Sequence, residues 1–433
     1  MGTILNAIYA ILLVALTPWL LIRILFLGKN RRGWGQKLLG LAPIRNSKSP
    51  CIWIHAVSVG EVNLLNPLVK QLRSQYPDFE FAISTTTETG YDLARKKFPD
   101  GIVFFCPTDF SWAVSNTIRR IRPELLLLTE LELWPNLVST ARRHDVRVAL
   151  INGRISEKSF VGYRRLRFIF SWALQHLNCA IVQTQDYANR MQQLGMPKER
   201  IYVCGNLKFD AMTGDQDLPT ANLIAELANI QPGEFVFVAG STQENEDRIA
   251  IDAYARLKPQ FPNLRMLLVP RHPDRAHRLT RYFELQSIAF AFRSELDKPA
   301  TSKPVLVVDT IGELAMCWSR ADVAYVGGSM GGRGGQNMIE PSAIGIPVCF
   351  GPQTENFKDV VELLLSNNAA QVVRDRDELE TLIRSALNKD SALAEMGIRA
   401  QRLVCAERGS TGRTIEILQP LISTGSKKFQ NAA

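Results

Sequence analysis

A glutamate at position 61 stands where a catalytic carboxylate could act. The stretch WIHAVSVGEVNLLNPLV, residues 53–69, passes from an apolar run into a helical pattern through a Ser-Val-Gly-Glu corner. A carboxylate there, beside a glycine that leaves the backbone unshielded, suits a position facing a cleft. The alternative is a capping box, in which Glu61 reaches back to the backbone N–H of Ser58. The same spacing recurs at Thr85/Glu88, Thr129/Glu132 and Ser241/Glu244, so the pattern leaves both interpretations open.

A second corner, FVFVAGSTQENED, could bind an anion. A predicted strand ends at Gly240, Ser241 and Thr242, and a helix begins near Glu244. Backbone N–H groups and hydroxyls at a helix start suit a phosphate. A well-capped helix without a ligand would show the same residues, and the sequence favours neither interpretation.

Arginine and histidine directly after a strand offer a further phosphate contact. In VPRHPDR, Pro270 ends an apolar run and Arg271 and His272 follow it. An arginine at this place could bind a phosphate through two parallel hydrogen bonds. A loop in which both side chains are only solvated is the alternative.

The densest pattern is the glycine-rich stretch of residues 325–357. It places six glycines between 327 and 335, ahead of a short predicted helix that Gln336 and Asn337 open and that carries Glu340. A turn needs one or two glycines, whereas this number allows a ligand close to the backbone. Asn337 and Glu340, three residues apart, would share a helix face and could hydrogen-bond a ribose or a base. We therefore expect a nucleotide here.

These corners divide the chemistry between the two halves of the chain. No G-x-G-x-x-G follows a first strand and no G-x-x-x-x-G-K-S/T occurs, which argues against dinucleotide oxidoreductases and P-loop NTPases. A nucleotide in the second half and an acceptor beside Glu61 in the first is the division found in two-domain sugar transferases.

The elements that must position these residues are parallel strands with helices between them. Apolar runs of strand length alternate with longer amphipathic segments, and ligands of such sheets bind at the carboxyl ends of the strands. The predicted strands are 51–57, 79–85, 102–106, 124–130, 146–153 and 179–184 in the first half, and 235–241, 264–270, 304–310, 321–328 and 346–352 in the second. The predicted fold class is α/β, with two doubly wound Rossmann-like domains facing a cleft.

The length of 433 residues exceeds what one core usually supports, so two domains are expected. The predicted segments are 1–30 as a membrane anchor, 31–209 as an acceptor-binding α/β domain, 210–223 as a polar linker, 224–424 as a nucleotide-sugar binding α/β domain and 425–433 as a flexible tail.

The N-terminal segment predicts a bilayer-spanning helix. Residues 4–27 contain one charged residue, Arg23, and are long enough to cross a membrane. Lys29, Arg31 and Arg32 follow, and the positive-inside tendency then places the main body in the cytoplasm. A cleaved signal peptide and an interfacial helix are the alternatives, although a signal peptide would normally have a basic residue ahead of the apolar run.

The net charge of +9 indicates an anionic partner, which could be a phosphorylated molecule, an acidic membrane surface or nucleic acid. Nucleic acid is the least expected, because no aromatic-interleaved recognition motif accompanies the charge. The seven cysteines are scattered and include no C-x-x-C pair, which predicts buried thiols in a reducing compartment.

Taken in order, the motifs of the chain resemble those of the 3-deoxy-D-manno-octulosonic acid (Kdo) transferases of lipopolysaccharide synthesis, which are glycosyltransferases of the GT-B fold. The resemblance spans nearly the whole chain through HAVSVGE, ELELWPNL, NGRISEKS, GNLKFD, GST, PRHP, IGEL, ADVAYVGGS, GGQNMIEP and GPQTENF. It implies an inverting transfer of Kdo from CMP-Kdo to the glucosamine disaccharide of a lipid A precursor, without metal or cofactor. An N-terminal anchor in the inner membrane, with the catalytic domains facing the cytoplasm, is also a family trait.

The resemblance implies catalytic roles at four positions. Glu61 matches the general base. Glu130 and Glu132 match two glutamates of which one stabilises the transition state, and Glu130, at the strand end, is preferred. Lys208 matches a second stabilising residue, whose positive charge suits the departing phosphate.

The resemblance also implies a donor site. The positions that match the CMP contacts are Pro270, Arg271, Ile311, Gly312, Glu313, Asn337, Met338, Ile339 and Glu340, and the predicted site adds Gly240, Ser241, Thr242 and His272. Where the family often has His, this chain has Gln243, Gln336 and Gln353. Glutamine keeps hydrogen-bonding capacity but carries no titratable charge.

Basic residues of the segment 152–170 are expected to bind the acceptor. Arg154, Arg164 and Arg165 are mixed there with aromatic residues. An anchored enzyme must draw a phosphorylated lipid from the membrane surface, so we expect these arginines to bind acceptor phosphates or membrane lipids. A solvated helix face is the alternative.

Two other functions stay open at this point. One is another GT-B enzyme that uses a different nucleotide sugar, such as a UDP-sugar, and CMP or UDP binding would discriminate it. The other is a nucleotide-binding membrane-surface protein without transferase activity. The joint presence of Glu61, Lys208, Arg271 and Glu340 argues against the latter, because a decayed site would have lost one of them.

Overall fold

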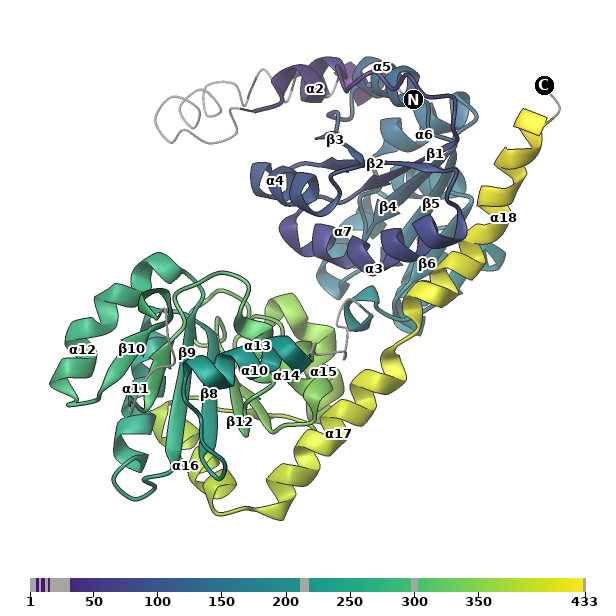
Figure 1. Cartoon of the computed structure of the whole chain (residues 1–433). Helices are drawn as coiled ribbons and strands as arrows, with labels where there is room; N and C mark the ends of the chain where they lie inside the picture. The colour runs from purple at the N-terminus through teal and green to yellow at the C-terminus, as the bar shows by residue number, and fades with distance from the viewer. Residues whose placement is uncertain are drawn as a thin grey trace. The chain divides into compact units, whose positions relative to one another are not determined.

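The chain forms two α/β units. The computed structural model describes residues 5–7, 9–11, 15, 32–210, 218–296 and 303–430. One unit comprises Met1–Ala211 with Arg408–Ala433, and the other Met212–Glu407. Each contains a seven-stranded sheet in which neighbouring strands run parallel (Figure 1). The predicted α/β class with two parallel sheets is confirmed.

The sheet of the first unit has the order β3-β2-β1-β4-β5-β6-β7. Its strands are β1 (Cys51–His55), β2 (Glu80–Thr85), β3 (Ile102–Phe105), β4 (Leu125–Thr129), β5 (Arg147–Gly153), β6 (Cys179–Val182) and β7 (Ile201–Val203). The strand order reverses between β1 and β4. This reversal makes the sheet doubly wound.

Helices cover both faces of this sheet. They are α2 (Trp34–Leu39), α3 (Val59–Gln75), α4 (Glu88–Lys97), α5 (Ser111–Ile121), α6 (Pro135–Arg143), α7 (Glu157–Arg165), α8 (Arg167–Gln175), α9 (Gln185–Gln193) and α18 (Ser410–Gln430), with 3-10 turns η1 (Lys198–Arg200) and η2 (Leu207–Phe209). Trp53 and Ile54 are neighbours in β1 and point to opposite faces. Trp53 packs in the cluster of α5, α6, α8 and α9, and Ile54 in that of α3, α4 and α18.

The sheet of the second unit has the order β10-β11-β9-β8-β12-β13-β14, so its reversal lies between β8 and β12. Its strands are β8 (Phe235–Thr242), β9 (Leu264–Pro270), β10 (Phe290–Phe292), β11 (Val305–Val307), β12 (Val323–Val326), β13 (Val348–Phe350) and β14 (Gln371–Val372). Its helices are α10 (Leu218–Leu227), α11 (Glu244–Leu257), α12 (Thr280–Leu285), α13 (Leu314–Trp318), α14 (Ile339–Ile344), α15 (Lys358–Ser366), α16 (Arg376–Leu387) and α17 (Ser391–Glu407), with 3-10 turns η3 (Pro273–Leu279), η4 (Arg293–Glu295) and η5 (Glu355–Phe357).

Three strands were not predicted, and all three lie at sheet edges. They are β7, β10 and β14, of three, three and two residues. An edge strand packs less of its surface than a central one, so its sequence need not form a continuous apolar run. The eleven predicted strands all contain an observed strand.

The end of the chain differs from the predicted domain boundaries. Residues 408–424 were assigned to the second domain, yet α18 packs on the first unit, with Leu418 buried beside β1 and α3. The predicted tail, 425–433, is helical as far as Gln430. In the predicted linker, 211–217 lie outside the described residues and 218–223 belong to α10.

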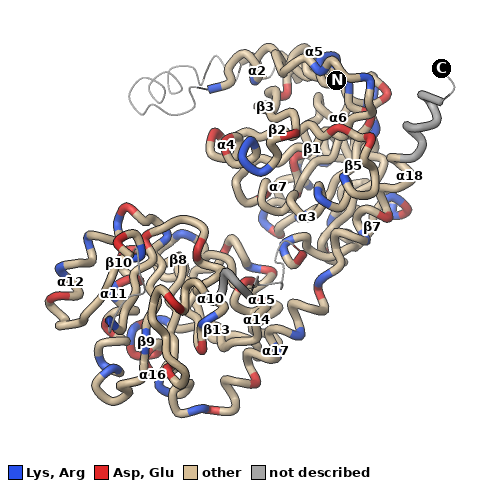
Figure 2. The backbone as a smooth tube through the Cα atoms, viewed as in Figure 1, with Lys and Arg blue, Asp and Glu red and all other residues tan. Residues whose placement is uncertain are grey.

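The predicted membrane anchor, residues 1–30, lies outside the described residues except for seven positions. Among the residues that the structure describes, no helix has both the length and the apolar character needed to span a bilayer. Figure 2 shows Lys and Arg interspersed with Asp and Glu along both units. By sequence, residues 212–407 carry 20 Lys and Arg against 26 Asp and Glu, whereas the rest of the chain carries 31 against 16, so the basic excess belongs to the first unit.

Candidate active site

Part of the predicted site lies at the two points where strand order reverses. Such a switch point opens a crevice at the carboxyl ends of the strands, where α/β sheets bind ligands. In the first unit, Glu61 follows β1 and Glu130 follows β4. In the second unit, β8 ends in the predicted donor segment 240–242, and the glycine-rich loop, residues 327–335, follows β12.

Glu61 is the third residue of α3, with 9% of its surface exposed. Its Oε2 accepts hydrogen bonds from the backbone N–H of Val57 at 2.9 Å and from the Thr129 hydroxyl at 2.5 Å. Its Oε1 accepts one from the Ser58 hydroxyl at 3.2 Å. The capping box with the Ser58 N–H is not formed, because the N–H that Glu61 binds is that of Val57. The carboxylate instead joins β1, α3 and β4.

The other three capping-box alternatives are also wrong. The first helical residue comes later than the spacing assumed, so α4 is capped by Thr87 and α11 by Gln243. Thr129 and Glu132 precede no immediate helix, because α6 begins at Pro135.

Burial raises the pKa of Glu61. The hydrogen bonds from Thr129 and Val57 favour the ionised form and lower the pKa, while the charges of Glu130 and Glu132 raise it again. A carboxylate with a raised pKa is a stronger base than one in water. Thr129 was not predicted as a site residue. The signal available was a lone hydroxyl at the end of the apolar run LLLLT.

Glu130 and Glu132 lie on the loop between β4 and α6. Glu130 has a left-handed backbone with φ 52°, and its N–H donates to the Ile151 carbonyl at 3.0 Å. Glu132 accepts a hydrogen bond from the Trp134 indole at 2.8 Å, and burial raises its pKa. Both carboxylates contribute to the pKa of Glu61, which places all three in one charged neighbourhood.

Lys208 lies in the turn after β7. Its backbone N–H donates to Asn206 Oδ1 at 3.0 Å, and the N–H of Leu207 donates to Asn152 Oδ1 at 3.0 Å. Asn152 and Asn206 thus fix this turn against the end of β5. In the sheet order, β5 and β6 separate β4 from β7. Lys208 and Glu61 therefore both follow the carboxyl ends of strands in this sheet, but the two strands are not neighbours.

The predicted acceptor arginines lie after β5. Arg154 directly follows Gly153, the last residue of β5, and is partly buried, whereas Arg164 and Arg165 end α7 and are exposed. The charge of Glu132 contributes to a raised pKa of Tyr163 on α7, so this helix lies within electrostatic reach of the Glu130–Glu132 loop.

At the ends of β8 and β12, the predicted donor residue Gly240 and the loop residue Gly327 have packing roles. A Cβ at Gly240 would stand 2.4 Å from the Trp318 ring of α13. A Cβ at Gly327 would stand 2.5 Å from Thr242 Cα, so β8 and β12 approach at their ends as only a glycine allows. Ser241 between these contacts has φ 54°. The absence of a side chain at Gly240 and at Gly327 lets the backbone pack closely.

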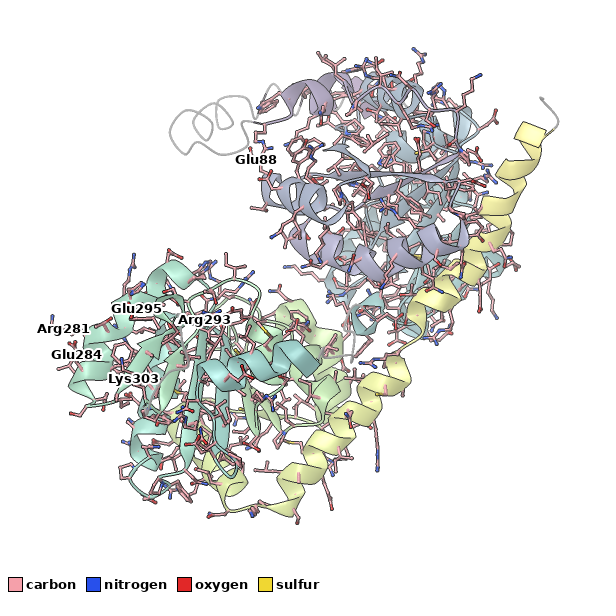
Figure 3. All side chains as sticks on the ribbon, viewed as in Figure 1. Glu88, Arg281, Glu284, Arg293, Glu295 and Lys303 are labelled. Carbon is pink, nitrogen blue, oxygen red and sulfur yellow. The ribbon has the colours of Figure 1, made fainter. Side chains whose placement is uncertain are left out.

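The loops after β9 and β11 carry further predicted donor residues. The Arg271 N–H donates to the Thr242 carbonyl at 3.0 Å, which joins the loop after β9 to the end of β8, and Arg271 and His272 are exposed. Ile311 is 90% exposed. Glu313 pairs with Arg293, labelled in Figure 3, at 3.1 Å.

Asn337 and Glu340 are in contact, although Asn337 precedes the helix instead of opening it. α14 begins at Ile339, whose N–H donates to Asn337 Oδ1 at 3.1 Å, while Asn337 Nδ2 donates to Glu340 Oε1 at 3.1 Å. Burial raises the pKa of Glu340. Met338 and Ile339 are buried. Across the described ranges, no group of three or more His, Cys, Asp or Glu side chains could hold a metal ion.

Several known proteins are similar to this chain. A family model described as 3-deoxy-D-manno-octulosonic-acid transferase (kdotransferase) matches residues 30–211. The 3-deoxy-D-manno-octulosonic acid transferase of Bordetella pertussis is 32% identical, covering 96% of this chain and 99% of the relative. The protein of the same name from Haemophilus influenzae is 30% identical, covering 86% and 87%.

Among solved structures, the UDP-GlcNAc 2-epimerase of Neisseria meningitidis, bound to UDP-GlcNAc, is similar with a TM-score of 0.57 at 12% identity. The match covers 86% of this chain and 100% of that one. An S. aureus MnaA–UDP structure is similar with a TM-score of 0.56 at 12% identity, and the match covers 86% of this chain and 97% of that one. At these identities the likeness shows the fold alone, an α/β fold of the GT-B type.

Proposed function

Because the chain belongs to the 3-deoxy-D-manno-octulosonic acid (Kdo) transferase family, a glycosyltransferase family, we propose that it moves Kdo from CMP-Kdo to the glucosamine disaccharide of a lipid A precursor. The anomeric configuration inverts in a single displacement. The observation that carries the mechanism is the Glu61 carboxylate at the switch point of the first sheet, buried and basic yet 9% exposed.

Glu61 acts as the general base in this proposal. It takes the proton of the acceptor hydroxyl as that oxygen attacks the anomeric carbon of Kdo, and the bond from this carbon to the CMP phosphate breaks with its electron pair on the phosphate. The raised pKa favours proton transfer to Glu61, while the Thr129 and Val57 hydrogen bonds keep an ionised form available. The neighbouring Glu130 and Glu132 charges add to its basicity.

Charge that develops during the displacement is stabilised from both sides. Positive charge grows on the Kdo ring, which suits a nearby carboxylate, and we assign this role to Glu130, with Glu132 as its alternative. Negative charge grows on the leaving phosphate. We assign the opposite charge to Lys208, in the turn after β7.

The donor site is proposed on the loops at the carboxyl ends of the strands of the second sheet. Arg271 and His272 are exposed for phosphate contact, and the exposed Ile311 offers apolar surface to a base. The Asn337–Glu340 pair holds a carboxylate that can accept from a ribose diol or a base amino group. Ser241, half-buried at the end of β8, can add a hydroxyl, whereas Thr242 is buried.

The acceptor and the membrane are proposed partners of the first unit. Arg164 and Arg165 are followed by Leu166 and Phe168, whose exposed fractions are 49% and 68%. Arginines interleaved with exposed apolar side chains suit an anionic lipid surface. Arg154 lies nearer the sheet edge, where it can bind an acceptor phosphate. Residues 1–30 are proposed to anchor the enzyme on the cytoplasmic side of the inner membrane.

A second candidate is another GT-B enzyme acting on a UDP-sugar, because the fold shared with a UDP-GlcNAc 2-epimerase does not by itself distinguish the two nucleotide sugars. The test is incubation of the enzyme with freshly generated CMP-Kdo and a tetraacylated lipid A precursor in detergent, in parallel with a melting-temperature comparison of CMP and UDP. Kdo-modified lipid together with stabilisation by CMP supports the proposal. Absence of product with stabilisation by UDP supports the alternative.

A further inference from the structure

A buried carboxylate in the second unit is surrounded by hydrogen-bond donors. Glu246 is the third residue of α11 and is 1% exposed. Its oxygens accept from the N–H groups of Gln243 at 2.8 Å, Gly328 at 2.6 Å, Ser329 at 2.8 Å and Met330 at 2.8 Å, and from the Tyr325 hydroxyl at 2.9 Å. Three of these donors, Gly328, Ser329 and Met330, are consecutive residues of the glycine-rich loop.

Successive N–H groups that converge form a concave anion site, which in many nucleotide-binding loops holds a phosphate. Here the anion in that position belongs to the protein itself. Gly328 has φ 69°, a left-handed conformation that turns its N–H and that of Ser329 toward the same point. The glycines at this end of the loop therefore serve an internal carboxylate, and a bound donor must use other groups.

The glycine-rich loop, which Glu246 binds, in turn contacts the loop after β13. The Ser329 hydroxyl accepts from the Gly351 N–H at 2.7 Å, and the Ser329 carbonyl accepts from the Gln353 N–H at 2.8 Å. A Cβ at Gly351 would stand 2.4 Å from the Ser329 carbonyl oxygen, so these segments are in close contact. Glu246 thus ties the helix after β8 to the loops after β12 and β13.

We propose that Glu246 is a positioning residue of the donor site, whose carboxylate fixes the glycine-rich loop in its ligand-binding conformation before CMP arrives. The inference rests on the proposed function, because it takes that loop to bind the donor. Ordering a loop on binding weakens affinity, so a loop already held by an internal anion binds more tightly. Glu246 itself touches no reacting atom.

A matched control lies at the other end of the same two strands. Asp322 Oδ2 accepts from the Val236 N–H at 2.7 Å and so ties the start of β12 to the start of β8. Asp322→Asn and Glu246→Gln each replace a carboxylate that binds backbone N–H groups in this unit. Only the second change places an NH2 donor against the glycine-rich loop.

The experiment measures CMP affinity by calorimetry and hydrogen exchange of the peptide spanning 327–335 in the full-length protein. For Glu246→Gln we expect the CMP Kd to rise about tenfold or more and the loop amides to exchange faster. The KM for CMP-Kdo should rise, while kcat at saturating donor stays within about threefold of wild type. Asp322→Asn should lower the melting temperature and leave both loop exchange and CMP Kd unchanged.

Tyr325→Phe tests the same contact if Glu246→Gln does not fold, since it removes one hydroxyl donor to Glu246 and should shift CMP Kd in the same direction by a smaller factor. Unchanged loop exchange in both loop variants, or an equal rise in CMP Kd for Asp322→Asn, would overturn the proposal. If wild type binds no CMP, the proposed function and the donor role both fail. Hydrogen exchange would then still decide whether Glu246 holds the loop.

Discussion

The two units each place a buried glutamate at the third residue of the helix that follows a central strand, and the two glutamates are bonded differently. Glu61 accepts from one backbone N–H and two hydroxyls, and 9% of it is exposed. Glu246 accepts from four backbone N–H groups, from the Tyr325 hydroxyl and, at 3.4 Å, from the Ser329 hydroxyl, and 1% is exposed.

The two carboxylates differ in whether the hydrogen-bond donors around them can reorient. A hydroxyl can rotate and exchange its partner, whereas the N–H groups of a folded loop are fixed by the backbone. The backbone donors around Glu246 cannot turn away from its carboxylate, while a hydroxyl beside Glu61 can reorient when Glu61 takes a proton. Burial alone therefore does not mark a catalytic carboxylate, and the kind of donor around it separates a base from a positioning residue.

The largest expected effect is that of Glu61→Gln on the rate. Removing the base should lower kcat about a hundredfold or more, with CMP affinity unchanged, because the side chain keeps its shape and loses only its basicity. Transfer of Kdo to the lipid A precursor measures the rate. Glu88→Gln, at the start of the next helix (Figure 3), is the control and should retain wild-type kcat.

Lys208→Met should lower kcat on the order of a hundredfold by removing a positive charge from the departing phosphate. Steady-state kinetics with saturating acceptor measure it. Lys198→Met removes a lysine from the preceding 3-10 turn and should have no such effect. Equal losses in both variants would mean that net charge, and not the position of Lys208, matters.

Thr129→Val should move the acid limb of the pH–rate profile to higher pH. The Thr129 hydroxyl lowers the Glu61 pKa, so its loss leaves the effect of burial less opposed and the pKa rises further. The base is active when ionised, and activity then appears only at higher pH. Thr117→Val is the control, since Thr117 is buried in α5 away from Glu61. An unmoved profile would show that Glu61 does not set it.

The smallest expected effect is that of the arginines on α7. Arg164→Gln with Arg165→Gln should raise the KM for acceptor in mixed micelles about fivefold per arginine, which corresponds to about 1 kcal/mol each, with kcat unchanged. The control removes the same charge from the second unit, as Arg281→Gln (Figure 3) with Arg402→Gln. The same rise in KM for the control pair would mean that the net charge of the protein, and not the position of these arginines, causes the effect.

The central strands and both switch points could be predicted because buried parallel strands require continuous apolar runs. Glu61 could be located for the same reason, since it follows such a run. The edge strands β7, β10 and β14 could not, because two or three partly packed residues leave no pattern. Nor could the return of α18 to the first unit, which depends on tertiary packing against α3.

Glu246 was missed for a local reason. The Ser241–Glu244 spacing suggested the cap, whereas β8 extends to Thr242 and the helix starts two residues later than that spacing requires. The spacing Gln243-x-x-Glu246 was present in the sequence. Its role depends on the loop after β12, about eighty residues away, which no local pattern shows.

The most direct test compares single-turnover transfer by Glu61→Gln and Glu246→Gln over a range of CMP-Kdo concentrations. If one carboxylate serves chemistry and the other donor binding, the Glu246→Gln rate should approach that of wild type as donor saturates. The Glu61→Gln rate should stay about a hundredfold lower at every concentration. A Glu61→Gln rate that reaches wild type at saturating donor would contradict the assignment of Glu61 as the base.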